Sequence, residues 1–156
     1  MRHLFSHATT ATAGLAALIS LGAAAPAAAQ MAPVTRTADD PALAWSPCPP
    51  IFAAGCEVAV LHGDPAQPNA DVFLRTPSGY VFPAHSHTSA ERMILIAGEL
   101  AVHYRGAEPA TLTAGDYAFG PAGLPHDASC AGEAPCVLFI AFEGPVDAVP
   151  FDGSLD

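Results

Sequence analysis

Short runs of alternating apolar and polar residues, separated by glycine and proline, dominate the chain after residue 55. Within residues 99–104, Leu100, Val102 and Tyr104 would share one face of a strand, because strand side chains alternate between faces. No segment after residue 31 keeps apolar residues at helical spacing for three turns. Many short strands with regularly spaced Gly and Pro turns are typical of β-sandwiches and barrels. The pattern therefore predicts one all-β domain.

The predicted strands are rich in β-branched, aromatic and aliphatic residues and lie between turn signals. They cover residues 56–61, 71–75, 80–82, 92–97, 99–105, 110–113, 117–119 and 136–142. The last run, CVLFIAF, is apolar on both faces, which predicts a strand deep in the fold. The proline-rich segment before the first strand is expected to lie on the domain as an arm. We accordingly divide the chain into residues 1–29, an arm at 30–54, a barrel at 55–145 and a tail at 146–156.

The first 29 residues have the pattern of a cleaved signal peptide. Arg2 supplies a short positive region, an alanine-rich apolar stretch follows, and three alanines before Gln30 fit a cleavage site. Glycine, serine and Pro26 interrupt that stretch, so we expect no stable membrane anchor. Cleavage would leave 127 of the 156 residues, which is enough for a substantial core. We therefore expect a periplasmic or secreted protein.

The net charge of the chain limits the classes of partner that it is expected to bind. Fifteen acidic residues face five arginines and no lysine, giving a formal net charge of −10 with the seven histidines neutral. Nucleic-acid phosphates and anionic membranes are bound by clusters of Lys and Arg, so we expect neither partner. A small-molecule ligand or substrate is consistent with this balance.

The chain has four cysteines, and an even count in an exported protein suggests disulfides. The simplest pairing is Cys48 with Cys56 and Cys130 with Cys136, although four cysteines allow three pairings. Their spacings differ from those of a zinc knuckle. For Cys130, a free thiol beside a metal is the alternative interpretation.

Three histidines and one glutamate have the spacing of a metal site. His85 and His87 are two residues apart, so on a strand both imidazoles would project from the same face. Glu91 has the same parity, but four residues of straight strand would carry it about 13 Å away. The small residues 88–90 must therefore turn the chain and return Glu91 on the next strand.

His126 follows a second set of turn signals and is the fourth candidate ligand. Three neutral imidazoles and one carboxylate suit a single divalent transition-metal ion, namely Fe, Mn, Ni, Cu or Zn. Such a ligand set leaves coordination positions for water, dioxygen or a substrate. No nucleophile elbow, phosphate loop or dinucleotide fingerprint occurs in the mature chain.

These residues resemble the two sequence motifs of the cupin family. The first motif, G-x5-H-x-H-x3-E-x6-G, is matched by Gly79, His85, His87, Glu91 and Gly98. The second, G-x5-P-x-G-x2-H-x3-N, is matched by Gly115, Pro121, Gly123 and His126, whereas Cys130 replaces its final Asn. The resemblance covers about residues 55–145 and implies a jelly-roll β-barrel with one central metal. The segments LHGDP at 61–65 and ERMILIAGEL at 91–100 further resemble single-domain cupins related to the cupin-like region of the ChrR anti-sigma factor.

The resemblance implies two alternative functions. The first is a metal-dependent enzyme, with dioxygenase, decarboxylase or isomerase chemistry, in which Glu91 could act as a catalytic base. The second is a non-catalytic periplasmic module that binds or senses a metal or small ligand. Cupins also pair through strand edges and N-terminal arms, which suggests a homodimer. Six residues are candidates for lining a small pocket, and ordinary barrel packing explains them equally well: Tyr80, Phe82, Met93, Leu95, Tyr104 and Phe119.

Overall fold

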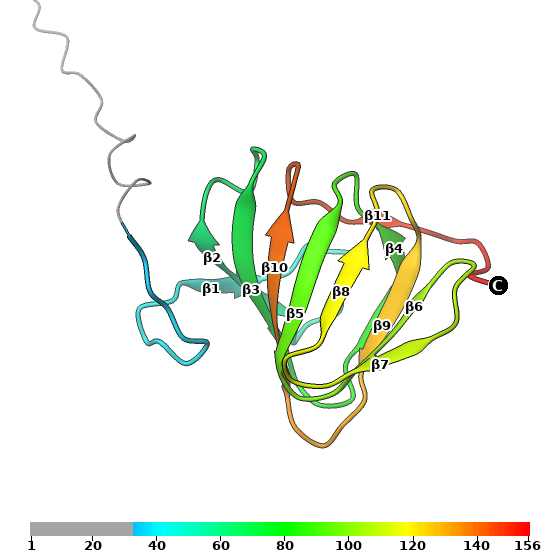
Figure 1. Cartoon of the computed structure of the whole chain (residues 1–156), viewed down its shortest axis with the longest axis horizontal. Helices are drawn as coiled ribbons and strands as arrows, with labels where there is room; N and C mark the ends of the chain where they lie inside the picture. Colours follow the sequence, from blue (N-terminus) through cyan, green and yellow to red (C-terminus); the bar gives the residue numbers. More distant parts are fainter. Residues whose placement is uncertain (1–32) are drawn as a thin grey trace, which may run out of the picture.

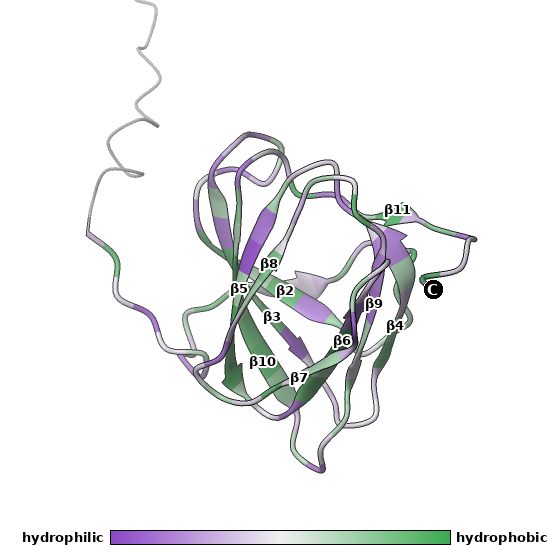
Figure 2. Ribbon diagram, turned by 45° about the vertical axis from the view of Figure 1, so that its right-hand side comes forward, coloured by the Kyte–Doolittle hydropathy of each residue, from purple (hydrophilic) through white to green (hydrophobic). Residues whose placement is uncertain are grey.

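The computed structural model describes residues 33–156, so the predicted signal peptide lies outside the described residues. The described chain folds into two antiparallel β-sheets that face each other (Figures 1 and 2). The first sheet has the order β1 (Trp45–Pro47), β2 (Glu57–His62), β3 (Ala70–Thr76), β10 (Cys136–Phe142), β5 (Glu91–Ala97) and β8 (Tyr117–Gly120). The second has the order β11 (Val149–Pro150), β4 (Val81–Ser86), β9 (His126–Cys130), β6 (Leu100–Tyr104) and β7 (Ala110–Leu112). The predicted all-β jelly roll is confirmed.

The core lies between the two sheets and follows the alternation in the sequence. Leu100 and Val102 of β6 are 2% and 3% exposed, whereas Ala101 between them is half-buried. In β10, every second residue from Cys136 to Phe142 is buried, and the residues between them line the outer face. β10 is paired on both sides, by β3 and β5. The strand predicted to lie deep in the fold is therefore central in its sheet but buried on one face only.

Three strands were not predicted from the sequence. β9 has the sequence HDASC, whose small and polar residues give no apolar alternation. The short strands β1 and β11 lie in the predicted arm and tail, where they extend the two sheets by pairing with β2 and β4. β4 also continues beyond its predicted end at Phe82, because a bulge accommodates Pro83, which has no N–H to donate. Among residues 33–156 there is no helix long and apolar enough to cross a membrane.

Candidate metal centre

The fold brings the three histidines together from two neighbouring strands. His85 at the end of β4 is the direct register partner of His126 at the start of β9, and their ring centroids are 4.4 Å apart. His87 follows the last residue of β4, with its ring 4.9 Å from His85 and 5.3 Å from His126. The three candidate ligand nitrogens all lie within 4.8 Å of one another. This cluster could hold a metal ion.

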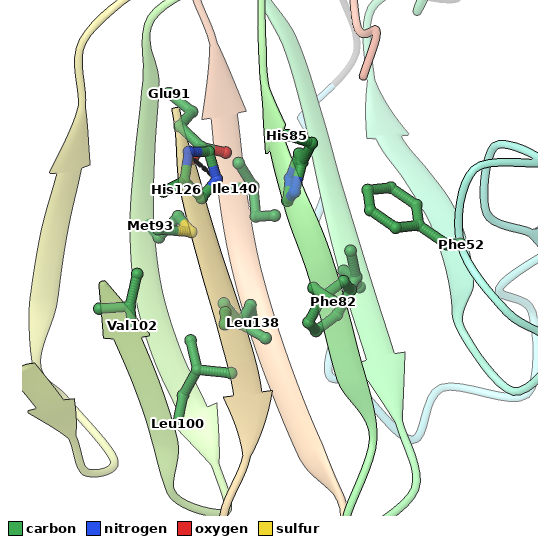
Figure 3. A pocket seen from close by; sticks show the side chains of 12 residues that line it. Phe52, Phe82, His85, Glu91, Met93, Leu100, Val102, His126, Leu138 and Ile140 are labelled. Carbon is green, nitrogen blue, oxygen red and sulfur yellow. Dashed lines mark ion pairs between the residues drawn. The ribbon is translucent and has the colours of Figure 1, made fainter. Parts of the chain in front are cut away.

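Glu91 reaches the cluster from the opposite sheet (Figure 3). The turn after His87 carries the chain from β4 in one sheet to β5 in the other, and Glu91 is the first residue of β5. Its Oε1 lies 3.4 Å from Nε2 of His126, and its Oε2 lies 3.5 Å from Nε2 of His87. A Cβ on Gly120, the register partner of Glu91, would lie 2.8 Å from Oε1. The glycine therefore leaves room for this carboxylate.

Backbone carbonyls fix the tautomer of all three imidazoles. Nδ1 of His85 lies 2.7 Å from the Pro83 carbonyl oxygen, and Nδ1 of His126 lies 3.2 Å from that of Leu124. Nδ1 of His87 is hydrogen-bonded to the carbonyl oxygen of Asp147. Because a carbonyl can only accept, each Nδ1 must carry the proton and donate it. Each Nε2 therefore keeps a free lone pair, as a metal-ligating histidine with this kind of supporting contact requires.

Burial keeps two of the imidazoles in the protonation state that a metal needs. Desolvation lowers the pKa of His85 to about 4 and that of His126 to about 3, so both imidazoles are neutral near pH 7. Burial raises the pKa of Glu91, whose side chain is only 3% exposed. Its Oε1 is fully buried and has no hydrogen-bond partner among the described residues. A buried carboxylate without a donor is costly, and a cation bound by the adjacent imidazoles would neutralise it. The donor set therefore fits a divalent transition metal.

Asp147 in the C-terminal segment holds His87 in place and was not predicted from the sequence. The backbone carbonyl of Asp147 accepts the hydrogen bond from His87. The side-chain carboxylate of Asp147 accepts two more, from the Thr88 backbone N–H at 2.9 Å and from the Thr88 hydroxyl at 2.6 Å. Three hydrogen bonds thus attach the segment after β10 to the turn that carries His87. Asp147 lies sixty residues from His87, and no local motif signals that contact.

We expect Asp147→Ala to weaken metal binding about tenfold. The carbonyl that orients His87 would remain, but its anchor on Thr88 would be lost, and loss of such supporting contacts costs about 10–100-fold in metal affinity. Competition titration with a chromogenic chelator measures this change. Asp152→Ala, an exposed acid in the same segment, is the matched control and should leave the affinity unchanged. Equal affinities for the two variants would contradict the role of Asp147.

An apolar cavity of about 50 Å³ adjoins the metal centre. Its polar lining consists of His85, Glu91 and His126, and its apolar lining includes Phe52, Phe82, Met93, Val102, Leu138 and Ile140 (Figure 3). Of the six predicted pocket residues, Phe82 and Met93 line this cavity. Phe52 was missed because it belongs to the predicted arm.

The other four predicted pocket residues lie elsewhere. Leu95 is fully buried in the core, and the hydroxyl of Tyr80 donates to the Ala53 carbonyl oxygen at 2.7 Å. Tyr104 packs on the His126 ring, 5.0 Å between centroids, and its buried hydroxyl has no partner among the described residues. The prediction for Phe119 is wrong, because this residue is 49% exposed. Phe119 is the register partner of Arg92, which points outward and pairs with Glu143.

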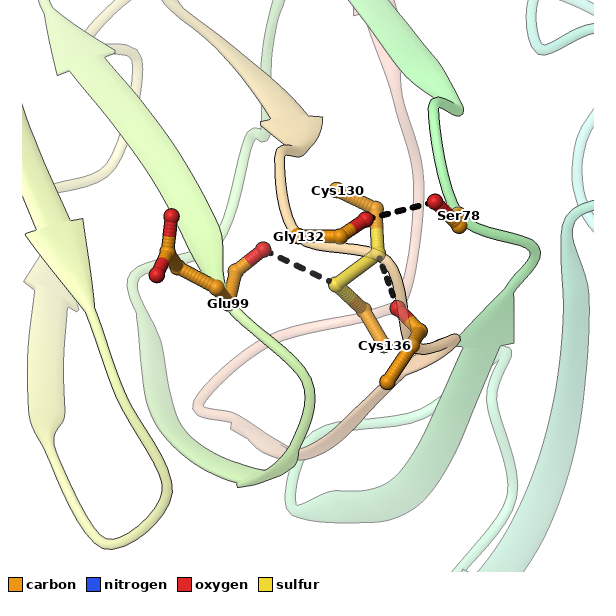
Figure 4. The surroundings of a disulfide bond; sticks show 6 residues. Ser78, Glu99, Cys130, Gly132 and Cys136 are labelled. Atoms are coloured by element: carbon orange, nitrogen blue, oxygen red, sulfur yellow. Dashed lines mark hydrogen bonds between the residues drawn. A yellow bond between two sulfur atoms is a disulfide. The ribbon is translucent and has the colours of Figure 1, made fainter.

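Both disulfides of the simplest predicted pairing are present. Cys48–Cys56 closes the loop that carries Phe52, and Cys130–Cys136 joins the end of β9 to the start of β10 (Figure 4). Cys130 and Cys136 are 1% and 0% exposed, and no described cysteine is free. The alternative of a free Cys130 thiol beside the metal therefore does not hold. Two disulfides indicate an oxidising compartment.

Reduction of both disulfides is expected to destabilise the fold substantially. Loop-closure entropy gives about 2–3 kcal/mol for each of these short loops, which corresponds to a fall in Tm of about 10–20 °C for both. Thermal unfolding followed by circular dichroism, before and after reduction in denaturant and blocking of the thiols, measures the difference. Thiol titration of the unreduced, unfolded protein should find no free thiol. Four free thiols would contradict both bonds.

Comparisons with known proteins agree with this architecture. The Cupin domain family matches residues 72–142, which include all four candidate ligands. A search of curated proteins finds no match for the chain. Among solved structures, the DMSP lyase DddQ from Ruegeria pomeroyi DSS-3 is similar at 22% identity and a TM-score of 0.61, over 72% of this chain and 64% of that one.

Two further solved structures have the same fold. A chain from the structures of the DMSP lyases RdDddP and RnDddQII has 18% identity and a TM-score of 0.62, over 70% of this chain and 63% of that one. An oxalate decarboxylase from Bacillus subtilis has 22% identity and a TM-score of 0.51, over 60% of this chain and 26% of that one. The chain thus spans less than two thirds of the length of each of these proteins. With the two-sheet fold and the matched motifs, the match over residues 72–142 identifies a cupin domain in this chain.

Proposed function

We propose that the protein is an exported, metal-dependent cupin enzyme that acts on a small organic molecule. The observation that carries the proposal is the convergence of three imidazoles and a buried carboxylate, of which His85, His126 and Glu91 line an apolar cavity. The signal-like pattern of residues 1–29 and the two disulfides support export to the periplasm or beyond. The segments LHGDP at 61–65 and ERMILIAGEL at 91–100 support the part of this proposal that assigns the protein to the small, ChrR-like single-domain cupins.

The residues around the cavity have separate roles in this proposal. His85, His87 and His126 would hold the ion through Nε2, and Glu91 would complete the set. A divalent ion in this position supplies Lewis acidity, or a binding position for dioxygen. Glu91 could also release the ion and accept a proton from the substrate, because its carboxylate lines the cavity and its Oε1 has no hydrogen-bond partner among the described residues. The apolar lining excludes water and orients the substrate.

Three reaction classes are consistent with this arrangement. Dioxygenation is compatible with the ligand set, which does not choose among these classes, whereas elimination and decarboxylation are suggested by the likeness to DMSP lyases and to an oxalate decarboxylase. That likeness is one of fold, and function depends on the site. A second candidate function, a binding or sensing module without catalysis, is favoured by the small size of the cavity, about 50 Å³.

Metal analysis combined with a turnover screen tests the proposal. Protein purified from the periplasm of its host should carry about one transition-metal ion per chain and begin near Gln30 after cleavage. It should then consume dioxygen, release carbon dioxide or eliminate a leaving group with at least one small carboxylic or phenolic compound. Bound metal without turnover across such a panel would favour the binding module. Protein that neither contains nor takes up metal would refute the enzyme and would also refute a module that binds a metal.

A further inference from the structure

The cavity beside the metal centre contains no cationic side chain of the described chain. The sequence has no lysine, and the four arginines of the described residues make contacts elsewhere. Those contacts are Arg36 with Asp40, Arg75 with Glu57, Arg92 with Glu143, and Arg105 over the ring of Phe151. A second anionic group too far from the first to bind the same ion would therefore be buried against apolar side chains without a partner, which is costly.

The cavity is also small. Its volume of about 50 Å³ compares with roughly 300–1,000 Å³ for sites that bind drug-sized ligands, and with about 150 Å³ for an apolar cavity that admits benzene. A ligand that enters without displacing a side chain must therefore have fewer heavy atoms than benzene. The apolar walls, among them Met93, Leu138 and Ile140, would contact its non-polar part.

Phe52 lines the side of the cavity that is not formed by residues of the barrel strands. Its ring stands edge-on to His85, with centroids 4.9 Å apart, and to Phe82 at 5.5 Å (Figure 3). Its loop is held by the Cys48–Cys56 bond, by the hydrogen bond from Tyr80 to the Ala53 carbonyl, and by that from the Phe52 N–H to the Pro49 carbonyl. Phe52 is thus fixed beside a candidate metal ligand although it comes from outside the barrel.

We infer that this site takes a small molecule with one metal-binding group, such as a carboxylate, and a short apolar remainder whose length Phe52 limits. The inference rests on the proposed function, because the metal ion is the anchor of the ligand's polar group. Such a site would exclude dianions of similar length. A smaller side chain in place of Phe52 should let the site accept a longer apolar chain.

Isothermal titration of the metal-loaded protein with two series of acids tests the inference. Straight-chain monocarboxylates from acetate to hexanoate should gain about fourfold in affinity per methylene until the cavity is filled, and then lose affinity. Butyrate should bind at least about tenfold more tightly than succinate, because the second carboxylate of succinate would extend into the apolar lining. Phe52→Ala should shift the optimum by about two carbons, and the conservative Phe52→Leu should shift it less.

Phe119→Ala is the matched control, because Phe119 lies on the outer surface at 49% exposure. This variant should keep the chain-length optimum of the wild type. Two outcomes would overturn the inference, provided that the protein still binds one metal ion per chain. They are equal affinity for mono- and dicarboxylates, and an unchanged chain-length optimum in both folded Phe52 variants. Absence of bound metal from the wild type would instead overturn the proposed function, and this inference with it.

Discussion

Replacing His87 with alanine is expected to abolish stoichiometric metal binding while leaving a folded barrel. His87 Nε2 faces the Glu91 carboxylate at 3.5 Å, and its Nδ1 is held by the Asp147 carbonyl. Loss of a supporting contact alone costs about 10–100-fold in metal affinity, so loss of the ligand itself should exceed 100-fold. Metal content by mass spectrometry, together with a chelator titration, measures the effect.

The barrel should survive because His87 lies just after the end of β4 and not within the main apolar core, where Leu95 and Leu100 pack. The far-ultraviolet circular dichroism spectrum should therefore match that of the wild type. His103→Ala is the control, since His103 belongs to the face of β6 opposite Leu100 and Val102. A His87→Ala protein with full metal content would refute the assigned site.

The sequence predicted that His85, His87 and His126 come together, because short-range spacing determines most of the geometry of this cluster. Two histidines separated by one residue on a strand must project to one face. A straight strand would have carried Glu91 about 13 Å away from them, so the chain had to turn between His87 and Glu91. The structure adds that this turn crosses between the sheets, so that the carboxylate faces the imidazoles from the other side. Strand periodicity likewise placed the inward residues of β6.

Long-range contacts could not be predicted in this way. His126 was recognised from its motif, but its strand β9 lacks apolar alternation and was missed. Phe52 and Asp147 reach the site from the predicted arm and tail, through a disulfide loop and through hydrogen bonds to the turn at Thr88. Side-chain periodicity describes one strand at a time, so it carries no information on which loop covers the end of a barrel.

Replacing Glu91 with glutamine is expected to lower kcat by at least about 100-fold in an enzyme that uses this carboxylate as its base. The amide has nearly the same shape but cannot accept the substrate proton at neutral pH. Three imidazoles would remain on the ion, so metal binding should weaken less than in His87→Ala. Steady-state kinetics on the substrate found in the turnover screen, with metal content measured on the same samples, separates the two effects.

The same substitution should raise the stability of the metal-free protein and reduce the stabilisation that the metal provides. In the metal-free protein, Glu91 is a buried carboxylate whose Oε1 has no hydrogen-bond partner, so its neutral replacement should raise Tm. In the loaded protein the carboxylate is paired with the ion, so the gain in Tm on metal addition should be smaller for the variant than for the wild type. Glu143→Gln, at an exposed ion pair with Arg92, should change neither kcat nor the response to metal. A Glu91→Gln protein with wild-type kcat and wild-type stabilisation by metal would show that this carboxylate neither binds the ion nor moves a proton.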